Sequence, residues 1–189
     1  MNIEIQKTPI KDVLVLRPDV YRDERGAFTE LFKFQHLKDQ GLEINVKQCN
    51  YSKSTKNILR GLHFQYDPPM GKLMRVVSGR VFLVAVDLRK KSSTLGKWFG
   101  KEMCADDLEL LWAPGCFARG FYVLSYDAEI EYLTSSEYNK AGEASIMWND
   151  PEIGIKWPIS PTTDPFLSDK DRNAQTLSEW LKTPQSNLF

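Results

Sequence analysis

The chain has 189 residues, 42% of them hydrophobic, and its 25 lysines and arginines are balanced by 25 aspartates and glutamates. That length and apolar content suffice for one domain with a substantial core, whereas the balanced charge gives no overall field that would hold nucleic acid or a membrane surface. No run approaches the ~18 apolar residues of a membrane span, and the first residues lack the apolar stretch of a signal peptide.

Short segments rich in β-branched and aromatic residues recur along the chain, and turn-forming residues separate them. The strand-like segments include residues 13–16, 73–77, 81–86, 120–124 and 129–133. The run of Ser78, Gly79 and Arg80 between two of them predicts a tight hairpin. Only residues 34–40 and 174–181 have a helical pattern, and both segments are short.

Many short strands without interleaved helices predict an all-β fold, an antiparallel sandwich or barrel with a few short helices. No internal repeat or linker divides the sequence, so we expect a single domain over residues 1–189. The tail from about residue 157 carries Pro158, Pro161 and Pro165 and a weak terminal helix. We expect this tail to wrap the outside of the sandwich.

One of only two histidines, His63, lies in the strand-like segment 58–65. Histidine titrates near neutrality and can take and return protons, although a half-buried histidine bonded to the backbone is the more ordinary interpretation. Arg60 and Lys72 lie nearby in sequence, and cations beside a buried imidazole are costly unless a negative charge is to form there. Together with two further acid–base candidates far along the chain, Tyr132 and Asp171, this set predicts proton abstraction next to a carbonyl group.

Arg60 and His63 have opposite parity, so in a flat strand they would face opposite sides of the sheet. Gly61 lies between them, at a position where a bulge would bring both side chains to one cavity.

Metal and thiol chemistry have weaker support. The other histidine, His36, lies in a predicted surface helix, which leaves one imidazole where β-sandwich metal sites usually use two or three. The cysteines Cys49, Cys104 and Cys116 are odd in number and lack C-x-x-C spacing, which favours a reduced, cytoplasmic setting. We expect no metal, and we expect Cys49 and Cys116 to be small core residues.

Three other residues that could belong to a functional site, Tyr132, Asp171 and Arg25, also have ordinary structural interpretations. Tyr132 could be a sheet aromatic with its hydroxyl at the rim of the sheet. Asp171 could belong to a solvated charge run, and Arg25 to a surface turn.

Several long motifs in one fixed order give the chain a specific resemblance. They are DERG at 23–26, LRGLHFQ at 59–65, GKL at 71–73, VAVDLRK at 84–90, GKW at 96–98, WNDP at 148–151 and LSDKD at 167–171, together with Gln48 and Asn50. From about residue 13 to residue 181 the chain resembles the dTDP-4-dehydrorhamnose 3,5-epimerases, sugar-nucleotide epimerases with a cupin-type jelly-roll fold. The resemblance implies a homodimer of jelly-roll subunits that uses no metal and no organic cofactor.

The resemblance also implies residue roles. His63 is the general base and is held by Asp171, Tyr132 is the acid on the opposite face of the sugar ring, and Lys72 stabilises the enolate. The nucleotide-diphosphate-sugar substrate would be held at family positions, with Tyr138 packing on the base and the sugar and diphosphate contacted by Arg25, Glu30, Gln48, Asn50, Arg60, Glu143 and Lys170.

The sequence departs from the family pattern in two places. Family members usually have PEGFAHG where this chain has PGCFARG at 114–120, so Arg119 replaces a histidine. Arginine cannot shuttle protons; it would contact phosphate or a different sugar, or help to stabilise the C4 oxyanion. Cys49 replaces the usual acid between Gln48 and Asn50.

The first choice of function is epimerisation at C3 and C5 of dTDP-4-dehydro-6-deoxy-D-glucose to dTDP-4-dehydro-L-rhamnose. Alternatives are a C3-only or C5-only epimerase, or one acting on another dTDP-, CDP- or GDP-linked 4-keto deoxysugar for a surface polysaccharide or a glycosylated metabolite. A non-catalytic jelly-roll sugar-binding module and a metal-dependent cupin oxygenase are candidates from other classes, disfavoured by the acid–base set and by the histidine count.

Overall fold

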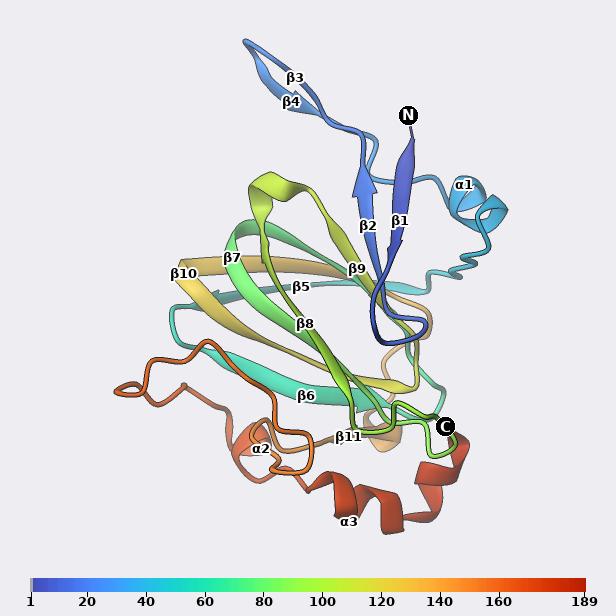
Figure 1. Cartoon of the computed structure of the whole chain (residues 1–189), viewed down its shortest axis with the longest axis vertical. Coiled ribbons are helices and arrows are strands. Elements are labelled where there is room, and N and C mark those ends of the chain that lie inside the picture. The colour runs from blue at the N-terminus through green and yellow to red at the C-terminus, as the bar shows by residue number, and fades with distance from the viewer. Residues whose placement is uncertain (1) are drawn as a thin grey trace.

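The computed structural model describes residues 2–189, and its main feature is a nine-stranded antiparallel sheet (Figure 1). Its strands are β1 (Ile3–Lys7), β2 (Leu14–Pro18), β5 (Gln48–Thr55), β6 (Leu59–Gln65), β7 (Lys72–Asp87), β8 (Trp98–Cys104), β9 (Leu110–Ala113), β10 (Phe117–Thr134) and β11 (Glu143–Ser145). The helices are α1 (Phe34–Asp39), α2 (Asp169–Arg172) and α3 (Leu177–Lys182), with 3₁₀ turns η1 (Ala105–Asp107), η2 (Lys140–Gly142) and η3 (Pro184–Leu188). The predicted all-β class is therefore confirmed.

Two long strands, β7 and β10, organise this sheet into two layers. The first half of β7 pairs with β9 and with the second half of β10, which in turn pairs with β5. The second half of β7 pairs with β8 and with the first half of β10, which pairs with β6, and β6 pairs with β11. Because each long strand runs through both layers, the sheet folds over on itself as a jelly roll.

The prediction of a tight hairpin at residues 78–80 is wrong, because the chain continues through them as one strand. Gly79 lies inside β7, and a register shift between Val123 and Ala128 of β10 accompanies it, so both strands bend together where a turn was expected. Gly79 has φ +75, and a Cβ there would lie 2.1 Å from the carbonyl oxygen of Asp127. The glycine therefore serves a strand irregularity and a close backbone approach.

The main hydrophobic core lies between the two layers. It combines Val76 and Ile130 from one layer with Val81, Phe117 and Val123 from the other, all buried. The inward-facing side chains of the two layers therefore meet and form one core, as in other two-layer β folds.

A second cluster joins the C-terminal segment to the outer face of β6 and β7 (Figure 1). Trp180 of α3 is buried, and its ring centroid lies 4.7 Å from that of Phe64. The helix begins with a capping box in which Thr176 and Glu179 satisfy each other's backbone N–H groups. The tail is thus fixed against the sheet, and it carries α2 close to β6.

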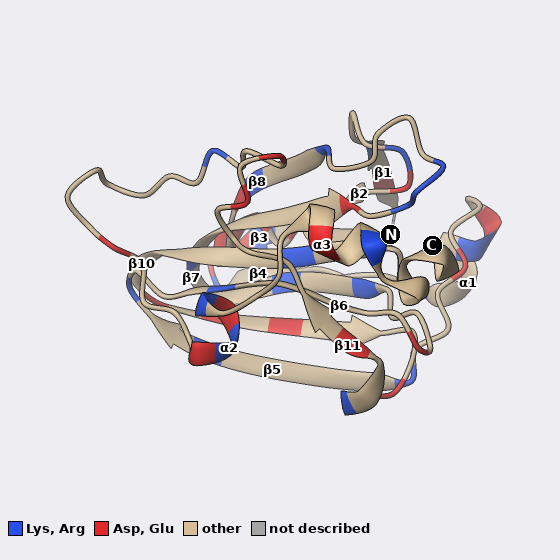
Figure 2. Cartoon of the chain, turned by 90° about the horizontal axis from the view of Figure 1, so that it is seen from below, with Lys and Arg blue, Asp and Glu red and all other residues tan. Residues whose placement is uncertain are grey.

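A two-stranded hairpin, β3 (Tyr21–Asp23) and β4 (Gly26–Phe28), projects away from the sheet at one end (Figure 1). Two of its aromatic residues, Tyr21 and Phe28, are 56% and 66% exposed. Figure 2 shows basic and acidic residues interspersed over the elements, in keeping with the balanced composition. No helix in the described part of the chain is long and apolar enough to cross a membrane.

Candidate active site

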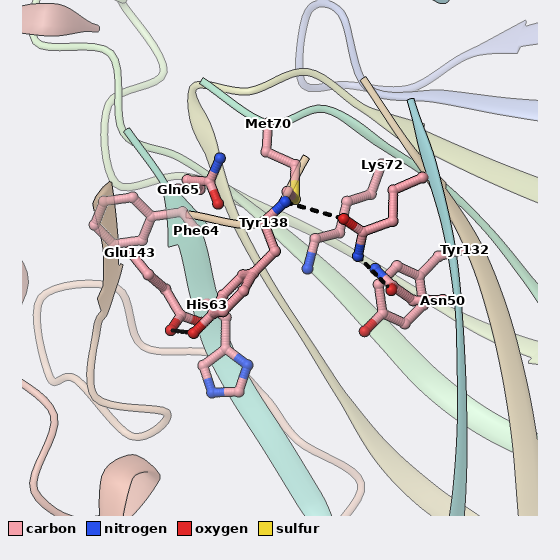
Figure 3. A pocket seen from close by; sticks show the side chains of 10 residues that line it. Asn50, His63, Phe64, Gln65, Met70, Lys72, Tyr132, Tyr138 and Glu143 are labelled. Atoms are coloured by element: carbon pink, nitrogen blue, oxygen red, sulfur yellow. Dashed lines mark hydrogen bonds between the residues drawn. The ribbon is translucent and has the colours of Figure 1, made fainter. Parts of the chain in front are cut away.

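Two adjoining cavities lie beside β6, β7 and β10. The outer one has a volume of about 290 Å³ and is lined by Gln48, Asn50, His63, Phe64, Gln65, Met70, Lys72, Tyr132, Tyr138 and Glu143 (Figure 3). The inner one has a volume of about 140 Å³ and is lined by Ser52, Arg60, His63, Lys72, Met74, Leu83, Arg119, Gly120, Phe121, Ile130 and Tyr132. His63, Lys72 and Tyr132 line both, so three of the four predicted catalytic residues lie where the cavities meet.

Gly61 explains how Arg60 and His63 reach the same cavity. Arg60 pairs with Phe121 and His63 pairs with Arg119, so three steps along β6 match two steps along β10. Gly61 has φ +131, and a Cβ there would lie 2.6 Å from the Cα of Gly120. The predicted bulge is present, and it reverses the side on which the following residues point.

Asp171 holds the imidazole of His63. Its Oδ1 is hydrogen-bonded to Nε2 of His63, and its Oδ2 accepts a hydrogen bond of 2.8 Å from Ser168, the N-cap residue of α2. Burial alone would raise the pKa of Asp171, but the bonds from His63, Ser168 and the Gly61 N–H outweigh it and hold that pKa below its usual value. An ionised carboxylate only accepts, so the proton of His63 lies on Nε2 and the lone pair on Nδ1.

Lys72 and Tyr132 form a second contact in the cavity. The Lys72 ammonium lies 4.8 Å from the centroid of the Tyr132 ring. Burial, followed by the charge of Arg119, lowers the pKa of Lys72 to about 7. Burial raises the pKa of Tyr132, so its phenol stays protonated near neutrality. The pair thus offers a proton donor and a cation whose charge is poised near pH 7.

Polar side chains surround the mouth of the outer cavity. Gln48 donates to Asn50 over 2.6 Å and accepts from the Tyr138 N–H over 3.0 Å, as Figure 3 shows. Glu143 accepts from the Tyr138 hydroxyl and forms an ion pair of 2.6 Å with Lys170. Burial is the largest single influence on Glu143 and opposes its ionisation, but the bonds and charges of Lys170 and Tyr138 together outweigh burial and lower the pKa of Glu143.

The family model described as dTDP-4-dehydrorhamnose 3,5-epimerase matches residues 7–179. The chain belongs to this family. A dTDP-4-dehydrorhamnose 3,5-epimerase of Shigella flexneri is 47% identical to it over 92% of this chain and 95% of its own length.

Solved structures agree with this family assignment. A dTDP-6-deoxy-D-glucose-3,5-epimerase from Legionella pneumophila in complex with dTDP-4-keto-L-rhamnose has a TM-score of 0.91 and 37% identity, covering 98% of this chain and 97% of that one. A 3'-monoepimerase from Streptomyces bikiniensis in complex with dTDP-quinovose has a TM-score of 0.84 and 34% identity, covering 90% and 86%. The jelly-roll fold expected from the epimerase resemblance is confirmed.

Four of the predicted epimerase site residues line neither cavity. Two of them, Asp171 and Lys170, bond to residues that do line a cavity. Arg25 lies on the projecting hairpin, where it is paired with Asp23 of the same turn. Glu30 follows the hairpin and lies 2.9 Å from Lys33. The other nine predicted residues of the set line one of the two cavities or both.

Arg119, the departure from the family motif, is buried in the inner cavity wall and is 3% exposed. Its terminal nitrogens donate to the carbonyl oxygens of Met70 and Pro114, each over 2.8 Å, and more weakly to that of Ala113. Burial lowers its pKa to about 9, so the side chain stays cationic near neutrality.

The sequence interpretation missed Ser52 and Ser168 and misplaced Cys49. Ser52 follows Asn50 by two positions on β5 and lines the inner cavity, so period-2 alternation could have found it. The same alternation turns Cys49 outward, and it is exposed, so its expected place in the core is wrong. Cys116 is half-buried and packs against the main core, as expected.

No group of three or more histidine, cysteine, aspartate or glutamate side chains that could hold a metal ion is found among residues 2–189.

Proposed function

We propose that this chain epimerises dTDP-4-dehydro-6-deoxy-D-glucose at C3 and C5 to dTDP-4-dehydro-L-rhamnose, with its own side chains moving the protons. The observation that carries the proposal is the arrangement of His63, Tyr132 and Lys72 around one connected cavity, with Asp171 bonded to His63. The names of the relatives support the same activity.

In this mechanism the C4 keto group acidifies the protons on C3 and C5. Nδ1 of His63 removes one of them, and Asp171 stabilises the imidazolium that forms. Negative charge then develops on the C4 oxygen, where the Lys72 ammonium stabilises it more than in the ground state. Figure 3 shows Tyr132 and His63 on different sides of the pocket, which supports return of the proton by the phenol to the other face of the ring.

The mouth of the cavity would hold the nucleotide. Tyr138 is 54% exposed there and offers a ring for stacking on the base. Lys170 provides a cation for the diphosphate, and Gln48 and Asn50 provide amide groups for the sugar.

The defining experiment is incubation of the protein with dTDP-4-keto-6-deoxyglucose in deuterated water, followed by NMR. We expect deuterium at both C3 and C5, together with the inverted product. Label at one carbon would instead select the second candidate, a mono-epimerase, which the Arg119 departure favours. Tight binding without label would indicate a sugar-binding module and refute catalysis.

Lys72 should set the alkaline limit of activity. The ammonium is the active form, and its fraction falls as the pH rises through about 7, so kcat/KM should decline above that pH. Lys72→Met should remove this limb and lower kcat by about 10²–10³-fold. The exposed Lys97→Met is the matched control and should retain the wild-type profile. A flat wild-type profile from pH 6 to 9 would contradict this role.

We also propose that the active form is a homodimer in which the β3–β4 hairpin reaches the partner subunit. The hairpin projects from the sheet and exposes Tyr21 and Phe28, an apolar surface typical of an interaction site (Figure 1). Arg25 and Glu30 lie outside the cavities of their own chain, so in a symmetric dimer they would complete the partner's site.

Subunit mixing tests this arrangement. Arg25→Ala should raise KM in its own homodimer, and His63→Ala should be inactive. After the two variants are mixed and allowed to exchange subunits, half of the dimers are mixed and each has one intact site, so about a quarter of wild-type activity at low substrate should appear. If Arg25 served its own subunit, mixing would add no activity beyond the Arg25→Ala share.

A further inference from the structure

Arg119 is an unusual group in the inner cavity because it is a buried cation without an acidic partner. Its guanidinium donates hydrogen bonds to the uncharged backbone carbonyls of Met70, Ala113 and Pro114. No ion pair of Arg119 is found among the described residues. A buried charge without a counter-charge is costly, so the folded protein keeps this cation in place at the expense of stability.

Two buried polar atoms in the same cavity wall also lack partners. The Nε–H of Arg119 and the Oγ of Ser52 have no hydrogen-bond partner in the described structure, although both residues line the inner cavity. Buried polar groups are nearly always satisfied, so such exceptions need an explanation. An oxygen-bearing ligand that enters the cavity would supply the missing acceptor for the Nε–H.

The surrounding charges show what kind of ligand fits. Lys72 shares the cavity with Arg119, and the positive charge of Arg119 helps to keep the Lys72 pKa low. Around Lys72, β10 also contributes Tyr132, β6 contributes His63, β11 contributes Glu143 and α2 contributes Lys170. The carboxylate of Glu143 is already paired with Lys170. Two cations beside one small cavity are stabilised together only when negative charge enters or forms between them.

We propose that Arg119 contacts the substrate, donating its Nε–H to the sugar oxygen on which negative charge develops as the proton leaves, and so acts beside Lys72 as a second cation of the reaction. This inference rests on the proposed function. The three backbone carbonyls fix the guanidinium before the substrate arrives, which is the preorganisation that makes such a donor effective. Where the family usually has a histidine, which can shuttle protons, this chain thus has a fixed positive charge that cannot.

The test compares Arg119→Gln and Arg119→Lys with the wild-type protein. Deuterium exchange at C3 and C5 gives kcat and KM, and calorimetry gives the dissociation constant of dTDP, which lacks the sugar and does not report on the inner cavity. We expect Arg119→Gln to lose about 10²–10³-fold in kcat while its affinity for dTDP stays within about two-fold of wild type. Arg119→Lys should recover part of the loss because it retains the charge.

The pH profile separates catalysis from a merely structural role. Removal of the Arg119 cation raises the pKa of Lys72, so the alkaline limb of kcat/KM should move above pH 7 in Arg119→Gln. Arg80→Gln, an arginine on the exposed part of β7, is the matched control and should behave as wild type. Arg119→His introduces the residue that is usual in the family and serves as a second variant in case Arg119→Gln does not fold. It should show the same loss in kcat and the same shift of the alkaline limb near neutrality.

Three results would overturn the inference. Wild-type exchange together with a kcat within about three-fold of wild type in Arg119→Gln and Arg119→His would refute it and leave the proposed function standing. Equal losses in the lysine and glutamine variants with an unmoved alkaline limb would reduce Arg119 to a structural support. Failure of the wild-type protein itself to exchange either proton would overturn the proposed function and this inference together.

Discussion

Replacing His63 by alanine is expected to lower deuterium exchange at both C3 and C5 by about 10³–10⁴-fold, the upper part of the range for one general base. The effect should be this large because Nδ1 of His63 is the group in the cavity that combines a free lone pair with a carboxylate partner. Tyr132 stays protonated because burial raises its pKa, so it does not replace the base near neutrality. NMR of the substrate in deuterated water gives the two exchange rates directly.

A matched control is available for this experiment. His36→Ala removes the other histidine, which lies on α1 and lines neither cavity, and should exchange at the wild-type rate. The dissociation constant of dTDP should change little in His63→Ala, which would show that the binding site is intact. Retention of more than about a tenth of the exchange rate at either carbon would refute the assignment of His63 as the base at that carbon.

The strands could be predicted from residue type, but their continuity could not. Segments 73–77 and 81–86 are correctly predicted to be extended, yet they belong to one strand, β7. Ser78 and Gly79 have the composition of a turn, and composition does not distinguish a turn from a bulge. The outcome is decided by β10, which bends at the same level and continues the pairing on both sides.

The chemistry of the site could be predicted further than its geometry. The lone glycine between Arg60 and His63 correctly indicated a bulge, because only a change of register brings residues of opposite parity to one face. Asp171 is different, since the sequence around it is that of a solvated charge run. It is buried because α3 and Trp180 fix the tail against β6, a contact between residues more than a hundred positions apart.

Two predicted substrate-binding residues lie away from the cavities of their own chain. Arg25 and Glu30 are expected to bind substrate from the family pattern, but they lie on and after a hairpin that leaves the body of the protein. In the homodimer proposed above, a symmetric partner would supply the residues that the fold of one chain holds away from its own cavities.

Replacing Tyr132 by phenylalanine should separate proton exchange from inversion. The variant loses the phenolic proton but retains the ring beneath the Lys72 ammonium, which lies 4.8 Å from its centroid, so the oxyanion site should be preserved. His63 can still remove a proton and return a deuteron to the same face. We expect exchange to remain within about ten-fold of wild type and inversion to fall by about 10²–10⁴-fold.

The measurement follows two rates in the same sample: deuterium entering the unchanged substrate, and the appearance of the inverted sugar. Tyr126→Phe removes an exposed hydroxyl from the same strand, at a side chain that is 87% exposed, and should leave both rates unchanged. Because the raised pKa keeps the Tyr132 phenol protonated across the range in which Lys72 loses its charge, the ratio of inversion to exchange in the wild-type protein should stay constant between pH 6 and 9 while both rates decline. A fall of exchange and inversion by the same factor in Tyr132→Phe would place the phenol on the side of proton removal, and the assignment of acid and base would have to be revised.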